Sequence, residues 1–116
     1  MNGLGRIHVL RYNGDMTKQD IKQAIEQGIQ NVPHPDYIRR VRLFGSYLHG
    51  DAREDSDIDL LVDFSEPVSF FELYDIEQSL SGILGGKKVE LTTPGGLSKF
   101  IRNEVLGEAE IIYEQE

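Results

Sequence analysis

The most informative stretch of this sequence is Gly45-Ser46-Tyr47-Leu48-His49-Gly50-Asp51-Ala52-Arg53-Glu54-Asp55-Ser56-Asp57-Ile58-Asp59-Leu60-Leu61-Val62. Residues 57–64 are predicted to form a strand, because their centre is apolar on both faces, as in a buried sheet. Side chains two positions apart in a strand point to the same face, so Asp57 and Asp59 project together. Two carboxylates this close repel each other unless a cation lies between them or one takes a proton. The spacing suits Mg²⁺, which prefers oxygen ligands and is usually completed by water and substrate phosphates.

The Gly45-Ser46 pair ends a predicted strand over residues 37–44 and precedes a short helical turn. At such a turn, backbone amides and a hydroxyl bind phosphate oxygens, and glycine lets the backbone approach the phosphates closely. Gly-Ser pairs are also common in ordinary turns. The pair becomes specific because an Asp-x-Asp strand follows eleven residues later. Together the two features predict a metal–nucleotide site.

These residues resemble the signature of the polymerase-beta-like nucleotidyltransferase superfamily. The matching blocks are Gly45-Ser46, Gly50-Asp51-Ala52-Arg53 and Ser56-Asp57-Ile58-Asp59-Leu60-Leu61-Val62. Within that superfamily, the short chain and its ending, Phe100-Ile101-Arg102-Asn103-Glu104-Val105-Leu106 with Ile111-Ile112-Tyr113, resemble the minimal nucleotidyltransferase (MNT) family. The similarity spans about residues 41–113.

The resemblance implies a third carboxylate on a neighbouring strand, and Glu90 is the residue at that position. Many relatives carry aspartate there, and the extra methylene of glutamate leaves direct metal coordination open. The predicted catalytic and metal-binding residues are therefore Asp57, Asp59 and Glu90, with an exposed, purely structural Glu90 as the alternative.

The predicted nucleotide-binding residues are Gly45, Ser46, Arg53 and Ser56. Two of them have equally plain structural alternatives. Arg53 either contacts phosphate or pairs with Asp51 or Glu54. Ser56 either steadies a phosphate or caps the start of the strand.

The activity implied by the resemblance is in-line attack on the α-phosphorus of ATP, with two Mg²⁺ ions clamping the phosphates. In the MNT family the usual partner is a HEPN-domain ribonuclease toxin. The MNT protein acts as its antitoxin by transferring AMP to a tyrosine of the toxin. The expected partner is accordingly a HEPN toxin in a hetero-oligomer. Two alternatives remain: a non-catalytic antitoxin that masks its partner, and a small-molecule nucleotidyltransferase.

Three further polar residues have weaker signals. Lys99 and Arg102 are predicted to lie on one face of the last helix, where they either meet the triphosphate or a partner, or are simply solvated. His49 is interpreted as a surface histidine rather than a general base.

Residues 1–116 are predicted to form a single α/β domain, a small mixed sheet flanked by helices. Residues 1–14 are expected to be a strand or a loosely attached arm. A first helix follows from Thr17, capped by Asp15 or Thr17 and ending near Pro33. A second helix is predicted from an apolar stripe of Phe70, Phe71, Leu73, Tyr74, Ile76, Leu80, Ile83 and Leu84, and a strand follows over Lys88–Thr93. A final helix is predicted to contain Leu97, Phe100, Ile101 and Val105, and a short last strand covers Ala109–Tyr113.

The composition limits the compartment and the partners. Twenty acidic and twelve basic residues give a net charge of −8, which disfavours direct binding to a polyanionic nucleic acid. There is no cysteine, so disulfides and thiolate chemistry are excluded. No signal peptide or membrane-spanning run is apparent in the sequence. These features predict a cytoplasmic protein.

Overall fold

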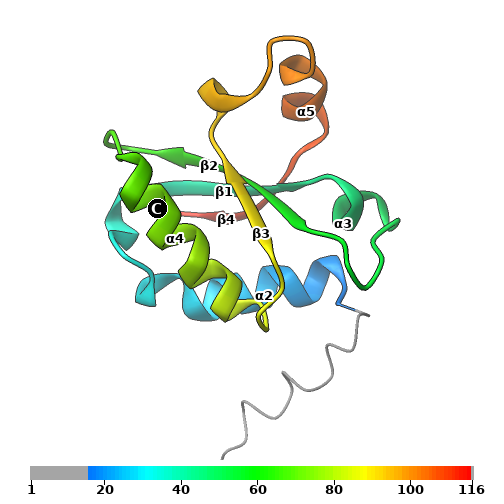
Figure 1. Cartoon of the computed structure of the whole chain (residues 1–116), viewed down its shortest axis with the longest axis horizontal. Coiled ribbons are helices and arrows are strands. Elements are labelled where there is room, and N and C mark those ends of the chain that lie inside the picture. The colour runs from blue at the N-terminus through cyan, green and yellow to red at the C-terminus, as the bar shows by residue number, and fades with distance from the viewer. Residues whose placement is uncertain (1–15, 116) are drawn as a thin grey trace, which may run out of the picture.

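A computed structural model describes residues 16–115, so the arm predicted over residues 1–14 lies outside the described residues. The described part is a mixed four-stranded sheet with helices on its faces (Figure 1). Its strands are β1 (Ile38–Phe44), β2 (Ile58–Phe64), β3 (Val89–Thr92) and β4 (Glu110–Glu114). This confirms the predicted fold class, and each strand begins within one residue of its prediction.

The strand order is β3-β2-β1-β4. β1 pairs antiparallel with both β2 and β4, whereas β2 and β3 run parallel. A parallel pair needs a crossover connection, and helix α4 (Phe70–Ile83) supplies it. The starts of β2 and β3 therefore meet at the same edge of the sheet, which is where the predicted carboxylates lie in the sequence.

Two helices cover one face of the sheet (Figure 1). Helix α2 (Lys18–Gly28) begins at Thr17 and α4 begins at Ser69, and both have a capping box that satisfies the first free amides. The two helices approach closely at Gly28, where a Cβ would come within 2.9 Å of Ile83. The core between the helices and the sheet is built from aliphatic side chains, chiefly Ile21, Ile25, Ile58, Leu60, Val62, Ile76, Leu80 and Ile112.

Helix α2 is shorter than predicted. It ends at Gly28, and a 3-10 turn, η2 (Ile29–Asn31), continues the chain toward Pro33. A second 3-10 turn, η3 (Pro35–Tyr37), leads into β1. Of the two predicted capping residues, Thr17 is the cap.

The final helix was predicted too long. Pro94–Gly96 forms a 3-10 turn, η4, and the helix α5 (Arg102–Glu108) begins only after Ile101. The reason lies in the chain around Leu97, which has an extended backbone and is buried. The next residues form a turn, in which the Ser98 carbonyl accepts hydrogen bonds from the amides of Ile101 and Arg102, and α5 lies above the second face of the sheet in Figure 1.

The apolar stripe predicted for α4 is only partly a core stripe. Ile76, Leu80 and Leu84 are fully buried, but Phe70, Phe71 and Tyr74 are exposed to solvent. The predicted end of the helix is confirmed, because Gly85 and Gly86 both have positive φ angles and the amide of Gly86 donates to the carbonyl of Ser81.

Helix α4 also fixes the position of β3. The Glu77 carboxylate accepts a hydrogen bond of 2.8 Å from the backbone amide of Leu91. Because β3 is an edge strand, this contact occupies an amide that the sheet leaves unpaired. It anchors the strand at the residue next to Glu90. No helix within residues 16–115 is long and apolar enough to cross a membrane.

Candidate active site

The turn after β1 lies directly against a carboxylate of β2. Gly45 has φ 79° and ψ −155°, a conformation that only glycine adopts readily. A Cβ at this position would overlap Oδ2 of Asp59. The short helix α3 (Ser46–His49) starts immediately afterwards and leaves its first amides without helical acceptors. The predicted phosphate-binding turn and the predicted metal-binding strand are therefore in contact.

The structure places Asp59 beside Glu90. In the parallel pairing of β2 and β3, Asp59 is the direct partner of Glu90, and in the antiparallel pairing it faces Phe44, the last residue of β1. Asp57 immediately precedes β2 and has the same side-chain parity as Asp59. All three predicted carboxylates thus come to one edge of the sheet, below the Gly45 turn.

The electrostatics of this edge disfavour the charged form of Asp59. The pKa of Asp59 is raised from 3.8 to about 6, first by burial and then by the charges of Glu90 and Asp57, with a hydrogen bond to Glu90 adding to the shift. A proton held between Asp59 and Glu90 relieves repulsion that a cation would otherwise relieve. The arrangement is that of a site built to receive positive charge.

The carboxylates at this edge are the kind of donor that a magnesium–nucleotide takes. Among the described residues, no three His, Asp or Glu side chains are arranged so as to hold a metal ion. Mg²⁺ usually takes one or two carboxylates, and phosphate and water oxygens complete its coordination. Asp57 and Asp59, with Glu90 alongside, would supply the carboxylates for such coordination.

Arg53 and Ser56 form a local turn next to the carboxylates. The Ser56 hydroxyl accepts a 2.7 Å hydrogen bond from the Arg53 amide, and the Ser56 amide donates to the Arg53 carbonyl. This geometry favours the structural reading of Ser56. Among residues 16–115, Arg53 makes no ion pair with Asp51 or Glu54, and its side chain is exposed. A contact between Arg53 and phosphate stays a prediction.

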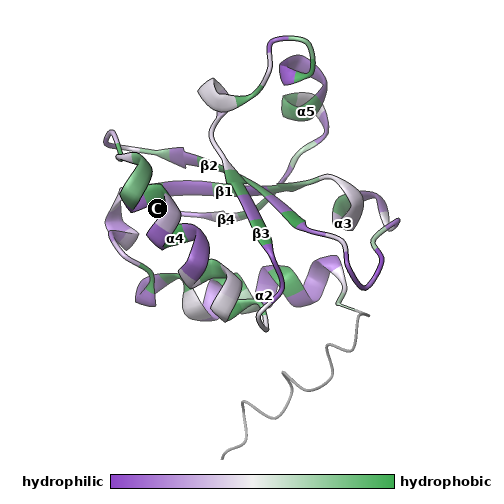
Figure 2. Cartoon of the chain, viewed as in Figure 1, coloured by the Kyte–Doolittle hydropathy of each residue, from purple (hydrophilic) through white to green (hydrophobic). Residues whose placement is uncertain are grey.

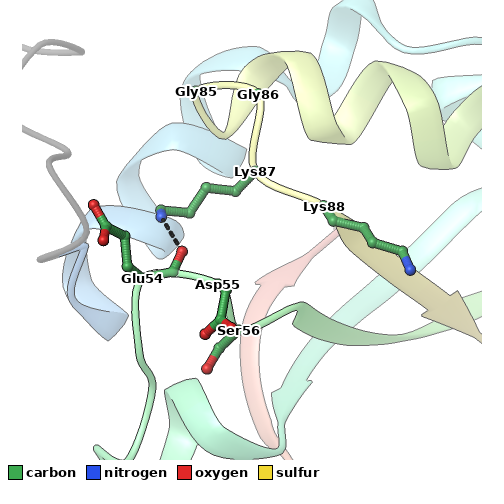
Figure 3. Close-up of a pocket in the computed structure, with 7 residues that line it drawn as sticks. All are labelled: Glu54, Asp55, Ser56, Gly85, Gly86, Lys87 and Lys88. Carbon is green, nitrogen blue, oxygen red and sulfur yellow. Dashed lines mark hydrogen bonds between the residues drawn. The ribbon is translucent and has the colours of Figure 1, made fainter.

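Sequence reasoning missed Lys88. Its ammonium lies 3.8 Å from Oδ2 of Asp57, and it lines a polar pocket of about 350 Å³ together with Lys87 and residues from two loops (Figure 3). The side chain is 78% exposed, so the pair contributes little to stability. Lys88 lies two residues before Glu90, just ahead of β3, which the sequence alone shows. Its approach to Asp57 depends on the pairing of β3 with β2.

Two of the weaker sequence predictions change. Lys99 precedes α5 and does not share a helix face with Arg102; its ammonium lies 5.6 Å from the centre of the Phe100 ring. Arg102 instead donates a 2.9 Å hydrogen bond to the carbonyl of Leu97 and so fixes the turn that ends the extended segment. His49 is a surface residue paired with Glu108 at 3.0 Å, which links α3 to α5.

The raised pKa of Asp59 predicts a pH-dependent effect of Asp59→Asn on the metal-free protein. The protonated carboxyl stabilises the fold fully below pH 3.8, and this contribution is lost as pH rises through about 6. Asparagine should therefore stabilise the protein by about 1–2 kcal/mol at neutral pH, after allowance for the solvent that still reaches the site. Thermal unfolding in EDTA should show this gain at about pH 7.5 and much less at about pH 4. Equal gains at the two pH values would contradict the assignment.

Comparison with known proteins identifies the family of this chain. Residues 23–116 match the family model described as "Polymerase beta, Nucleotidyltransferase". The protein adenylyltransferase MntA of Thermococcus cleftensis is 40% identical over 98 residues, which cover 84% of this chain and 96% of that protein.

Two solved structures share the fold. A toxin–antitoxin structure with AMP-PNP has a TM-score of 0.65 at 21% identity, over 82% of this chain and 74% of the other. A tri-AMPylated HEPN toxin of Shewanella oneidensis in complex with an MNT antitoxin gives 0.60 at 20% identity, over 84% and 72%. The family model matches most of the chain, MntA is 40% identical to it, and its Gly45 turn lies against the carboxylate of Asp59. This chain therefore belongs to the polymerase beta nucleotidyltransferase family and, within it, to the minimal nucleotidyltransferases.

Proposed function

We propose that this nucleotidyltransferase moves AMP from ATP to a tyrosine hydroxyl of a HEPN-domain toxin and thereby acts as its antitoxin. The observation that carries the proposal is the packing of Gly45 on Asp59, with Asp57 and Glu90 beside it. This packing puts a turn suited to phosphate and a set of carboxylates suited to a cation within one small volume. The name of the Thermococcus relative, a protein adenylyltransferase, supports a protein acceptor.

Each residue has a defined part in the proposed reaction. The amides at Gly45-Ser46 orient the triphosphate, with Arg53 and Ser56 beside them. Asp57 and Asp59 would hold two Mg²⁺ ions, which when bound neutralise phosphate charge and polarise the acceptor oxygen. Glu90 is the direct strand partner of Asp59, and it takes up the proton of the acceptor hydroxyl. The acceptor oxygen forms a bond to the α-phosphorus as the bond from that phosphorus to the bridging oxygen breaks, and pyrophosphate leaves.

Modification of a HEPN toxin fits the chemistry of both proteins. AMP adds a negative phosphate and a bulky nucleoside, which oppose RNA binding by charge and by sterics. One transfer persists after the two proteins separate, whereas masking requires continuous occupancy. The S. oneidensis complex, in which a HEPN toxin is AMPylated, supports both this acceptor and a hetero-oligomer.

The proposal predicts labelled transfer in a defined mixture. The full chain, Mg²⁺ and α-labelled ATP should label a HEPN-domain toxin supplied as its partner, and mass spectrometry should place an AMP-sized addition on a tyrosine. Changing that tyrosine to phenylalanine should remove the label, since only the nucleophilic oxygen is lost. The Asp57→Asn/Asp59→Asn variant is the negative control in the same mixture.

Two other outcomes would replace the proposed activity. If the wild-type pair shows no AMP addition while the double variant still protects cells from the toxin, the protein acts by masking its partner. If label appears on a small molecule and never on protein, the acceptor has been misassigned.

A further inference from the structure

The first turns of α4 carry large aromatic side chains that the fold leaves in solvent. Phe70 is 89% exposed, Phe71 is 85% exposed and Tyr74 is 60% exposed. With Val68 they form what we call the aromatic face. Figure 2 shows this end of α4 as strongly hydrophobic. Beside it is a hollow of about 420 Å³ lined by Val68, Ser69, Phe70, Phe71, Leu73 and Thr93.

The exposure follows from the sequence of the helix. Residues in an α-helix turn by about 100° each, so positions 70, 71 and 74 share an arc of about 100°. Ile76 and Leu80 lie on a different arc and are fully buried against the sheet. Helix α4 therefore has two apolar faces, and the fold uses only one of them. Adjacent exposed phenylalanines are the kind of patch that marks a protein interface.

The surroundings of the aromatic face are acidic. Glu66 and Asp75, which flank the aromatic face in the sequence, are exposed, and residues 54–86 contain no lysine or arginine. Glu72, in the first turn of the same helix, pairs with His34 at 3.2 Å and caps the helix through the amide of Ser69. An apolar patch with a carboxylate rim complements a partner whose apolar pocket is bordered by Lys and Arg.

We infer that the aromatic face is the surface on which the HEPN partner docks, through an apolar pocket with a basic rim. The identity of the partner rests on the proposed function. A protein that binds RNA carries the Lys and Arg that this rim requires. A second copy of this chain fits poorly, because a two-fold contact would bring Glu66 and Asp75 against like charges, on a chain with a net charge of −8.

Docking at this face is separate from the chemistry. Asp59 lies near the start of β2, whereas α4 begins shortly after the end of that strand. At about 3.3 Å per residue, the two ends of the strand are roughly 20 Å apart. The partner is therefore held at one end of β2 while its acceptor hydroxyl reaches the other end. Substitutions on the aromatic face should change KM for the partner and leave kcat unchanged.

The test is titration of the full chain with the HEPN-domain toxin used as its partner in the transfer assay. Phe70→Ser/Phe71→Ser should weaken binding at least about 100-fold, since each buried aromatic anchor contributes about tenfold or more. Asp75→Lys should weaken binding several-fold at low salt and less at high salt. Phe100→Ser is the matched control, because Phe100 is 86% exposed but lies between η4 and α5; it should bind like the parent. Circular dichroism should confirm that all variants fold.

Several results would overturn the docking surface. These are unchanged binding by Phe70→Ser/Phe71→Ser, an equal loss in Phe100→Ser, a parent chain that does not bind the HEPN protein, or a parent dimer that the double variant dissociates. Failure of the proposed chemistry gives a different result. In that case the parent binds through the aromatic face but transfers no AMP.

Discussion

Replacing Asp57 and Asp59 together by asparagine should lower the rate of AMP transfer at least about 1,000-fold, which corresponds to about 4 kcal/mol of lost transition-state stabilisation. Asparagine keeps the shape of each side chain but removes the negative charge that would bind the metal–nucleotide. The Gly45 turn already lies against Asp59, so the loss arises from charge and not from a rearranged backbone. Initial rates with α-labelled ATP at saturating partner measure it.

The double variant should also remain well folded. Removing the charge of Asp59 relieves repulsion from Glu90 and Asp57, so a rate lost through unfolding is not expected. Asp55→Asn is the matched control, because it removes an exposed carboxylate only two residues from Asp57. A double variant that retains more than about a tenth of the parent rate would contradict the metal-site assignment.

Gly45→Ala should destabilise the protein and disable the site at once. The backbone conformation of Gly45 costs other residues about 1–3 kcal/mol, and the new methyl group overlaps the Asp59 carboxylate. Asp59 must then move, and a displacement of about 1 Å at a reacting centre costs about 100-fold in rate. Chemical denaturation and transfer rates on the same preparation separate the two effects.

Gly50→Ala provides the control for backbone strain alone. Gly50 also has φ 79°, but nothing lies within 4 Å of a Cβ placed there. We expect a destabilisation of about 1–2 kcal/mol from the left-handed conformation with the transfer rate unchanged. If both alanine variants lose activity equally, the contact between the turn and Asp59 has no special role.

These predictions place catalysis at one end of β2 and partner docking at the other. One end of the strand brings carboxylates under a tight turn, and the other leads through a loop to an aromatic helix end. A protein acceptor must be held in place while the transfer occurs. An exposed face on the crossover helix fulfils that need without altering the reacting groups.

The sequence by itself determined the features that depend on near neighbours. The alternation that aims Asp57 and Asp59 to one side, the glycine turn after β1 and the double-glycine end of α4 are local, because strand parity and helix termination are set within a few residues. The order of elements and the fold class followed from the same patterns, and the family resemblance added the third position, Glu90.

Only the tertiary structure decided which distant groups meet. The register of β2 against β3 places Glu90 beside Asp59 and Lys88 near Asp57, and strand pairing leaves no signature within either strand. Periodicity identified α4 but not which of its two apolar arcs is buried, since that depends on the sheet and on α2. Similarly, Leu97 is buried in an extended conformation, and the final helix begins only at Arg102, later than expected. Long-range packing selects among local conformations of similar energy, and it left Phe70, Phe71 and Tyr74 facing solvent.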